Sequence, residues 1–334
     1  MPRLILIALV LLLGLAPAVG LADESPANET APPATRAMLA DGVLRIGAAH
    51  AGATNQRGAA GPPARVRRLA AGVAARPAAP VSARLAHRVV IRTLGLNAER
   101  LGLARLAAGG VALARPRDLP TEVLVRELGL RPNRPAAEDG LERTAREHLS
   151  TDDLDAMVRA ALALDSWDLQ RLTRYRDIVL PAMGPRARMV VEAALRQVGQ
   201  PYVWGGDAPT RRSRWGGQAH GGFDCSGLVW WAFKGDRRAA ALGVGEVIGG
   251  RTADAMAWEV PRARIRAGDA AAGDLVVFGT RGPRTPRGAI SHVGIALGGG
   301  WMVHSAGSRN GPSISHMDDY WPSGIAFGRR MGLD

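Results

Sequence analysis

The chain contains a single cysteine, Cys225, among its 334 residues. This cysteine follows Asp224 and precedes the apolar run 228–233, so the pattern predicts a helix that Asp224 caps and that holds Cys225 in its first turn. The first turn of a helix favours an anion, because its unpaired N–H groups and the macrodipole face that end. The pattern therefore predicts a thiol with a lowered pKa and a nucleophilic sulfur. Taken alone, a lone cysteine is more often a small buried apolar side chain.

Two of the seven histidines, His292 and His304, lie on strand-like segments that only the glycines 298–300 separate. A hairpin centred on Gly298 places the two imidazoles directly opposite one another, with Cβ atoms about 4.5 to 5.5 Å apart. A two-residue turn would shift the register by one position. A thiol and two adjacent imidazoles supply a nucleophile, a base and a group that orients the base, which is the set that thiol-dependent acyl transfer requires.

A zinc site is the alternative chemistry for Cys225, His292 and His304. The absence of a second cysteine and of a closely spaced histidine pair disfavours it, so we expect no metal and no other cofactor. The remaining histidines are interpreted as structural or surface residues: His50, His87, His148, His220 and His316.

The first residues predict export. Residues 1–22 combine Arg3, an apolar stretch and a small-residue end at Ala22, which is the pattern of a cleaved secretory signal peptide. The apolar stretch is too short and too interrupted by Pro and Gly for a confident membrane span, and no cysteine near Ala22 offers a lipoprotein anchor. We therefore expect a secreted protein without stable membrane insertion after cleavage.

The formal net charge is +13, and Lys234 is the only lysine, so arginine supplies almost all of the positive charge. A strongly basic exported protein suits an anionic surface such as a cell-wall polymer. Nucleic acid is disfavoured as a partner, because no nucleic-acid-binding motif stands out and export removes the chain from the cytosol.

Composition divides the chain into segments. Residues 23–80 are rich in Ala, Pro and Arg with little apolar periodicity, and they predict a disordered tether. Residues 81–184 predict a helical region, and residues 185–334 are long enough for one domain with its own core. Within the last segment a helical pattern precedes four strand-like segments, which predicts an α+β fold.

The helical region contains two similar segments, each with a serine before an amphipathic helix, at Ser82 and at Ser150. A third helix is expected over 121–130. This arrangement resembles degenerate surface-layer homology repeats, a wall-anchoring module, although the usual Thr-Arg-Ala-Glu start is absent. A plain helical spacer stays open as the alternative.

Several ordered motifs of the C-terminal domain resemble those of the NlpC/P60 cysteine peptidases of bacterial cell walls. The motifs lie at 198–200, 201–206, 224–229, 273–276, 291–295 and 304–305. The resemblance implies a papain-like fold, in which N-terminal helices pack on an antiparallel sheet. It also implies hydrolysis of a peptide bond in peptidoglycan stem peptides, commonly the bond between γ-D-glutamyl and the diamino acid.

The resemblance also assigns roles. It makes Cys225 the nucleophile, His292 the base and His304 the third member of the triad. It places Tyr202 near the oxyanion and lines the substrate subsites with Asp224, Ser226 and Ser291. Two structural alternatives stay open, since Tyr202 could only pack its ring and Asp224 could only cap the helix. The tryptophans Trp204, Trp230 and Trp231 are assigned to core packing.

Two arginine-containing loops depart from the spacing of that family, at 207–222 and 279–288. One precedes the cysteine helix and the other precedes the strand of His292, so we expect both to border the cleft. They predict a basic rim that attracts carboxylates of stem peptides, with incidental surface charge as the alternative.

Two further function classes stay open beside the peptidase. One is a catalytically silent cell-wall-binding protein that keeps the fold. The other is transfer of an acyl group to another acceptor, which the export signal and the segment around Tyr202 disfavour.

Overall fold

The computed structural model describes residues 31–51, 61–108, 118–133, 142–213, 216–217 and 221–333. The predicted signal peptide, residues 1–22, lies outside the described residues. Residues 32–334 form one compact unit, so no break between units falls at the expected boundary near 184.

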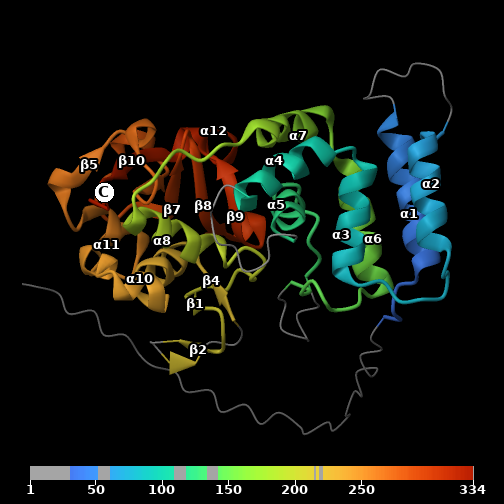
Figure 1. Cartoon of the computed structure of the whole chain (residues 1–334), viewed down its shortest axis with the longest axis horizontal. Helices are drawn as coiled ribbons and strands as arrows, with labels where there is room; N and C mark the ends of the chain where they lie inside the picture. Colours follow the sequence, from blue (N-terminus) through green and yellow to red (C-terminus); the bar gives the residue numbers. More distant parts are fainter. Residues whose placement is uncertain are drawn as a thin grey trace, which may run out of the picture. The chain divides into compact units, whose positions relative to one another are not determined.

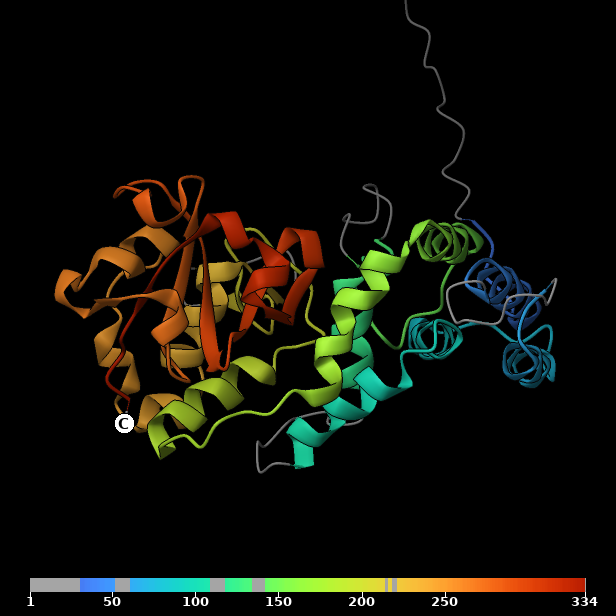
Figure 2. The same cartoon turned by 90° about the horizontal axis from the view of Figure 1, so that it is seen from above.

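Four helices of the N-terminal half run with nearly parallel axes, which Figure 2 shows end-on. They are α1 (Arg36–Ala49), α2 (Ala64–Ala74), α3 (Ala83–Thr93) and α6 (Thr151–Ala163). The expected serine caps are confirmed, because Ser82 accepts a hydrogen bond from the N–H of Leu85 and Ser150 forms a capping box with Asp153.

Helices α1 and α2 lie in the range where the sequence predicts a tether, and the structure differs there. Their apolar residues recur at intervals of four and three positions and are buried: Leu39, Val43 and Ile46 in α1, and Val66, Ala70 and Val73 in α2. This spacing gives each helix one apolar face, which the abundance of Ala and Pro obscures in the sequence. The two faces pack against each other and against α3.

The other helices of this half include α4 (Asn97–Ala108), α5 (Leu119–Glu127) and α7 (Ser166–Arg171). The 3₁₀-helix η3 (Leu172–Asp177) follows α7. Helix α5 matches the helix expected over 121–130, and it packs against an edge strand of the sheet, as Figure 1 shows.

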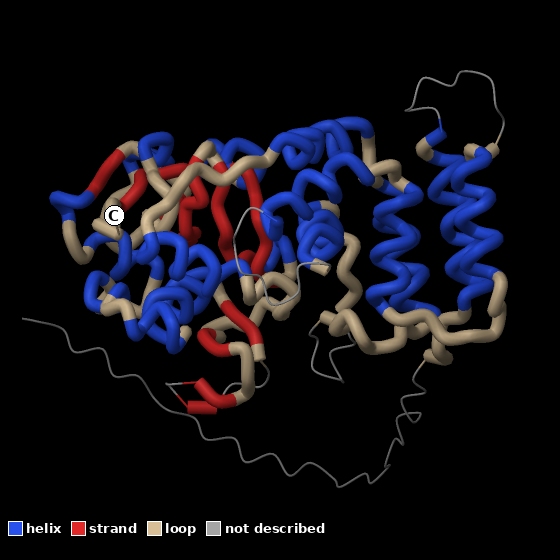
Figure 3. The backbone as a smooth tube through the Cα atoms, in the orientation of Figure 1, coloured by secondary structure: helices blue, strands red, loops and turns tan. Residues whose placement is uncertain are grey.

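The C-terminal part supplies the sheet, and Figure 3 shows its strands beside shorter helices. Six strands pair in the order β5-β10-β6-β7-β8-β9, and all neighbours are antiparallel. Their bounds are β5 (Arg264–Ile265), β6 (Leu275–Gly279), β7 (Ile290–Gly298), β8 (Trp301–Ala306), β9 (Gly311–His316) and β10 (Ile325–Arg329). The short pairs β1 (Asp207–Ala208) with β4 (Gly222–Phe223) and β2 (Arg212–Ser213) with β3 (Gly216–Gly217) precede them.

Five helices accompany the sheet: α8 (Pro185–Leu195), α9 (Cys225–Trp230), α10 (Arg237–Ala241), α11 (Ala253–Trp258) and α12 (Met317–Tyr320). The expected α+β class is confirmed, with α8 and α9 packed against strands β7 and β8. Strand β9 is absent from the sequence prediction, since Pro312 and two serines hide its apolar signal.

The β7–β8 register differs from the expected one. His304 pairs with Gly294, and His292 pairs with Phe278 on β6. The strands are joined by a two-residue turn at Gly299 and Gly300, both with positive φ, and the ladder contains a bulge between Ala296 and Gly298. The hairpin is therefore not centred on Gly298, and the two histidines are diagonal neighbours on one face of the sheet.

The apolar core is continuous from the N-terminal helices to the sheet. One cluster of buried residues contains Leu39 of α1, Leu124 of α5 and Val293 of β7. A smaller cluster covers the other face of the sheet and contains Val276, Phe278 and Met302. Within the described residues, no helix combines the length and the apolar character needed to cross a membrane.

Candidate active site

Cys225 is the first residue of helix α9, as the sequence predicts. The carboxylate of Asp224 caps the helix, accepting hydrogen bonds from the N–H of Gly227 at 2.5 Å and from the N–H of Gly205 at 3.0 Å. A side chain at position 227 would collide with the carbonyl of Gly206, since its Cβ would lie 1.8 Å from that oxygen. The glycine after Ser226 therefore lets the start of the helix approach the preceding loop.

The pKa of the Cys225 thiol is raised to about 11, first by burial and then by the Asp224 carboxylate. Backbone N–H groups, including that of Val293, act in the opposite direction. The expectation of a lowered thiol pKa is wrong, because the helix start is buried and lies beside an acidic cap. The contact with Val293 places the sulfur next to the backbone of the residue that follows His292.

The two imidazoles of the site are hydrogen-bonded to each other. His292 Nε2 lies 2.8 Å from His304 Nδ1, and the ring planes are nearly perpendicular at 85°. Burial lowers the pKa of His292 to about 3. The pKa of His304 is lowered well below its ordinary value, first by burial and then by the neighbouring His292 ring. Both rings are therefore neutral near pH 7.

The hydrogen-bond chain continues past the predicted residues. His304 Nε2 lies 2.9 Å from the hydroxyl oxygen of Ser315, and Ser315 lies 2.6 Å from a carboxylate oxygen of Glu127. Neither residue was found by the sequence analysis. Ser315 is 11 positions from His304 and Glu127 is 188 positions from Ser315, so no local motif connects them.

A cavity of about 660 Å³ opens beside the thiol. It brings together six of the seven predicted site residues, and these are Tyr202, Asp224, Cys225, Ser226, Ser291 and His292. The seventh, His304, is fully buried and lies behind His292, to which it is hydrogen-bonded. The thiol therefore has a route to solvent and shares that space with one imidazole.

The predicted subsite residues occupy different positions around this cavity. Tyr202 is half-buried, and its pKa is raised to about 12 by burial and by nearby Cys225 and Asp224. The hydroxyl of Ser226 donates to Asp224 at 3.2 Å and accepts from Arg251 at 2.9 Å, so it stabilises the capping carboxylate of the helix. Ser291 is exposed at the cavity wall.

Two further residues that line the cavity contact the predicted site residues, and the sequence patterns do not indicate either of them. Arg251 lies 3.4 Å from Asp224 and also donates to the carbonyl of Gly205 at 2.9 Å, which ties the cap to the loop before the cysteine helix. Tyr320 of α12 packs its ring against both imidazoles, with centroids 5.1 Å from His292 and 4.3 Å from His304. Neither residue lies in a motif that would identify it.

The tryptophan assignments are partly wrong. Trp204 is 87% exposed and lines the cavity, so it does not belong to the core. Trp230 is buried, and Trp231 is half-buried with its ring 6.0 Å from that of Phe223. Trp204 follows an extended segment held by the backbone of Phe223, which leaves its indole in solvent.

The described arginines of the two predicted rim loops do not line this cavity. Arg211 and Arg212, like Arg281, Arg284 and Arg287, are absent from the residues that line it, and Arg214 lies outside the described residues. Arg251 is the arginine among the lining residues. In the part of the chain that the structure describes, no three His, Cys, Asp or Glu residues gather in a group that could hold a metal ion.

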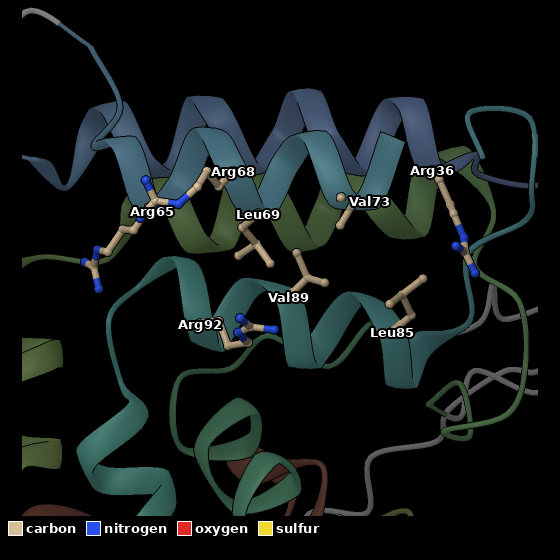
Figure 4. A pocket seen from close by; sticks show the side chains of 9 residues that line it. Arg36, Arg65, Arg68, Leu69, Val73, Leu85, Val89 and Arg92 are labelled. Carbon is tan, nitrogen blue, oxygen red and sulfur yellow. The ribbon is translucent and has the colours of Figure 1, made fainter. Parts of the chain in front are cut away.

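A second cavity, of about 510 Å³, lies between α2 and α3. Figure 4 shows four apolar side chains between the helices, Leu69, Val73, Leu85 and Val89, with arginines around them. We call this cavity the arginine groove, after the arginines that line it, which are Arg36, Arg65, Arg68 and Arg92. Among the described residues no carboxylate pairs with them, whereas Arg84 nearby is paired with Asp118 at 2.9 Å.

Comparisons with known proteins agree with this geometry. A family model described as "NlpC/P60 family" matches residues 199–327. Murein DD-endopeptidase MepH of Escherichia coli is 33% identical over 147 residues, which cover 43% of this chain and 45% of that protein. The bifunctional muramidase/DL-endopeptidase CwlT of Bacillus subtilis is 38% identical over 147 residues, covering 42% of this chain and 35% of that protein.

The chain thus spans less than half the length of these curated relatives. Among solved structures, the P60 domain of an antigen from M. avium subspecies paratuberculosis is 28% identical. That match has a TM-score of 0.33 and covers 45% of this chain and 96% of that domain.

Proposed function

Because residues 199–327 carry an NlpC/P60 family domain, we propose that the chain is a cysteine peptidase that hydrolyses a peptide bond in peptidoglycan stem peptides. One observation carries the proposal: a single cavity holds the Cys225 thiol and the His292 imidazole, and His304 lies 2.8 Å behind His292. The names of the relatives, a murein DD-endopeptidase and a DL-endopeptidase, support this substrate class. The bond between γ-D-glutamyl and the diamino acid is the one we propose.

The proposed mechanism begins from a neutral pair. His292 Nε2 is engaged by His304, so Nδ1 is the nitrogen left to take the thiol proton as the sulfur attacks the carbonyl carbon. His292 then gives this proton to the leaving amine, and a thioester of Cys225 remains. Water, deprotonated by His292, hydrolyses the thioester and releases a carboxylate product while the thiol regains a proton.

Two kinds of hydrogen-bond donor near the sulfur are placed to stabilise the negative charge that develops on the carbonyl oxygen during attack. The backbone N–H groups of Cys225 and Ser226 face the thiol, and the Tyr202 hydroxyl shares the cavity. Burial raises the pKa of Tyr202 to about 12, so the phenol keeps its proton near pH 7 and can donate a hydrogen bond to an oxyanion.

The test uses the full chain and purified peptidoglycan. Mass spectrometry of the soluble fragments should show new termini at one stem-peptide bond, and the Cys225→Ala variant should release none. Intact folding of that variant is checked by circular dichroism. Release of no fragment by the wild-type chain from several peptidoglycan chemistries would reject the proposed activity.

We further propose that the protein is exported and acts at the cell wall. The predicted signal peptide supports export, and the net charge of +13 supports attraction to an anionic wall. Mass spectrometry of the extracellular protein should find a mature N-terminus at Asp23. Retention of residues 1–22 on a protein confined to the cytosol would contradict it.

The arginine groove favours a second function for the N-terminal helices, adhesion to an anionic wall polymer. Four guanidinium groups without a carboxylate partner among the described residues surround an apolar floor, which suits a polyanion with apolar backbone carbons. Adhesion without hydrolysis is also what a catalytically silent protein would show, so both properties need separate measurement.

Replacing the four groove arginines by glutamine should weaken binding to inorganic polyphosphate and to purified walls. A control variant carries the same charge change at four exposed arginines elsewhere in the N-terminal half of the chain, Arg76, Arg88, Arg146 and Arg159. Equal binding by the two variants would show that net charge alone is responsible. Adhesion by Cys225→Ala at the wild-type level would separate adhesion from hydrolysis.

A further inference from the structure

We propose that Glu127, on helix α5 and outside the segment that matches the family, is a positioning residue for the catalytic base. Through Ser315 it fixes which nitrogen of each imidazole carries the proton. The inference rests on the proposed peptidase function for its kinetic part and on hydrogen-bond geometry for its structural part.

Helix α5 packs against strand β9, and the side chain of its last residue, Glu127, contacts side chains of that strand. Glu127 is 2% exposed. One of its oxygens, Oε1, accepts hydrogen bonds from Ser315 Oγ at 2.6 Å and from Ser313 Oγ at 3.1 Å. Both serines are fully buried, so water does not compete for these hydroxyl groups.

The position of Glu127 is fixed by its neighbour in sequence. Arg126 is fully buried and donates to the backbone carbonyls of Gln200 at 2.9 Å and of Arg309 at 3.1 Å. Its guanidinium is paired with Glu142 at 2.5 Å. These contacts hold the end of α5 between the segment before Tyr202 and the turn that leads into β9.

Glu127 is paired with two guanidinium groups. Arg171 lies 3.3 Å from Oε2 and Arg309 lies 3.2 Å from Oε1. Arginine stays protonated in proteins, and a carboxylate can only accept hydrogen bonds. The hydroxyl proton of Ser315 must therefore point to Glu127.

This direction determines the rest of the chain. Ser315 has one proton, so its oxygen can meet His304 only as an acceptor, and His304 Nε2 must carry a proton. His304 Nδ1 is then an acceptor, which requires His292 Nε2 to donate to it. The remaining nitrogen of His292, Nδ1, is unprotonated and able to take the proton of the thiol.

Without the carboxylate, the reverse chain becomes available. Ser315 could donate to His304 Nε2, His304 Nδ1 could donate to His292 Nε2, and His292 would then carry its proton on Nδ1. That tautomer has no lone pair for the thiol proton and cannot act as the base. Glu127 thus selects the productive one of two otherwise similar hydrogen-bond arrangements.

The test compares three variants in the full chain: Glu127→Met, Ser315→Ala and their combination. Each should lower kcat about 10- to 100-fold with little change in KM, which is the range that outer-shell partners of functional histidines carry at metal sites. The double variant should lose no more than either single variant, because both remove the same chain. Imidazole nitrogen chemical shifts measured by NMR should show His292 protonated on Nε2 in the wild type and a mixture of tautomers in the variants.

Ser313→Ala is the matched control. Ser313 donates to the same carboxylate oxygen from the same strand and is equally buried, yet its hydroxyl makes no hydrogen bond to the His304 ring. This variant should keep the wild-type tautomers and kcat. If Glu127→Met does not fold, the comparison of Ser315→Ala with Ser313→Ala decides alone.

The two proposals fail in different ways. Unchanged tautomers and unchanged kcat in Ser315→Ala and Glu127→Met would overturn the positioning role and leave the peptidase standing. Changed tautomers in the variants, combined with a wild-type protein that cleaves no peptidoglycan, would support the positioning role and reject the proposed substrate. Equal losses in Ser313→Ala and Ser315→Ala would also overturn the role, because they would reflect general packing.

Discussion

His304 lies opposite Gly294 across the β7–β8 ladder, and this pairing decides how the two imidazoles meet. A glycine opposite His304 leaves room for its ring to incline towards His292, two positions along the same face. The hydrogen bond of 2.8 Å between the rings is thus made by diagonal neighbours.

The first prediction concerns this pair, in the variant Gly294→Ala. The new methyl carbon would lie 3.1 Å from both the Cβ of His304 and the sulfur of Met302, so the histidine must shift by a few tenths of an ångström. We expect kcat on stem peptides to fall on the order of 10-fold, since displacement of a catalytic group by about 1 Å can cost about 100-fold. Gly268→Ala is the control, because nothing lies within 4 Å of the Cβ it would add. Wild-type kcat in Gly294→Ala would show that the site tolerates the shift.

The second prediction concerns the charge beside the thiol. Asp224→Asn keeps a capping side chain and removes the negative charge that raises the pKa of Cys225, so this pKa should fall. Arg251→Gln removes the guanidinium 3.4 Å from Asp224, so the pKa should rise further. The measurement is the pH dependence of alkylation by iodoacetamide, whose rate in the wild type should still increase above pH 9, since the pKa is about 11. Shifts of the same sign in both variants would contradict this account of the thiol.

The third prediction concerns stability in acid. His292 has a pKa of about 3 when folded and about 6.5 when unfolded, so between these values only the unfolded chain takes up the proton. The free energy of unfolding should therefore fall as the pH decreases below about 6.5, by about 1 kcal/mol per pH unit for each such histidine. Burial lowers the pKa of His87 and His304 in the same direction.

Denaturant unfolding between pH 7.5 and pH 5 measures this slope. His292→Gln should reduce it, whereas the same substitution at the exposed His148 should leave it unchanged. A slope that is equal in His292→Gln and the wild type would contradict the prediction. Glu122, whose pKa is lowered by Arg131 and His87 against the effect of burial, should contribute only below its ordinary pKa of about 4.5.

The fourth prediction concerns Trp204, whose exposed indole lines the cavity. Trp204→Ala should raise KM for stem peptides about 3- to 10-fold at nearly constant kcat, because an aromatic contact contributes about 0.5 to 1.5 kcal/mol. Trp167→Ala is the control, since Trp167 is also exposed, at 62%, and is not among the residues that line the cavity. A fall in kcat without a change in KM would place Trp204 in the chemistry and not in binding.

Local patterns predict part of this site well. Neighbouring residues predict three kinds of feature that the structure contains. These are the helix that starts at Cys225, the serine caps of α3 and α6, and four strands of the sheet. Each depends on interactions within a few positions of the chain, which the sequence displays directly.

Features that depend on burial or on distant pairing were not predictable in this way. The raised pKa of Cys225 arises from the packing around it, and the turn at Gly299 and Gly300 was one of several that three glycines allow. Glu127 lies 188 positions from Ser315, and only the packing of α5 on β9 brings the two together.

Arg126 also limits where the chain could be divided into fragments or grafted onto another protein. Arg126 lies outside the family-matched segment 199–327, and its guanidinium donates to three backbone carbonyls inside it, those of Gln200, Arg309 and Asn310. A fragment that begins near residue 199 would leave those carbonyls without the Arg126 donor. It would also expose Ser313 and Ser315 to solvent, whereas both are fully buried in the whole chain. The smallest transplantable unit therefore begins upstream of the peptidase motifs, at or before helix α5.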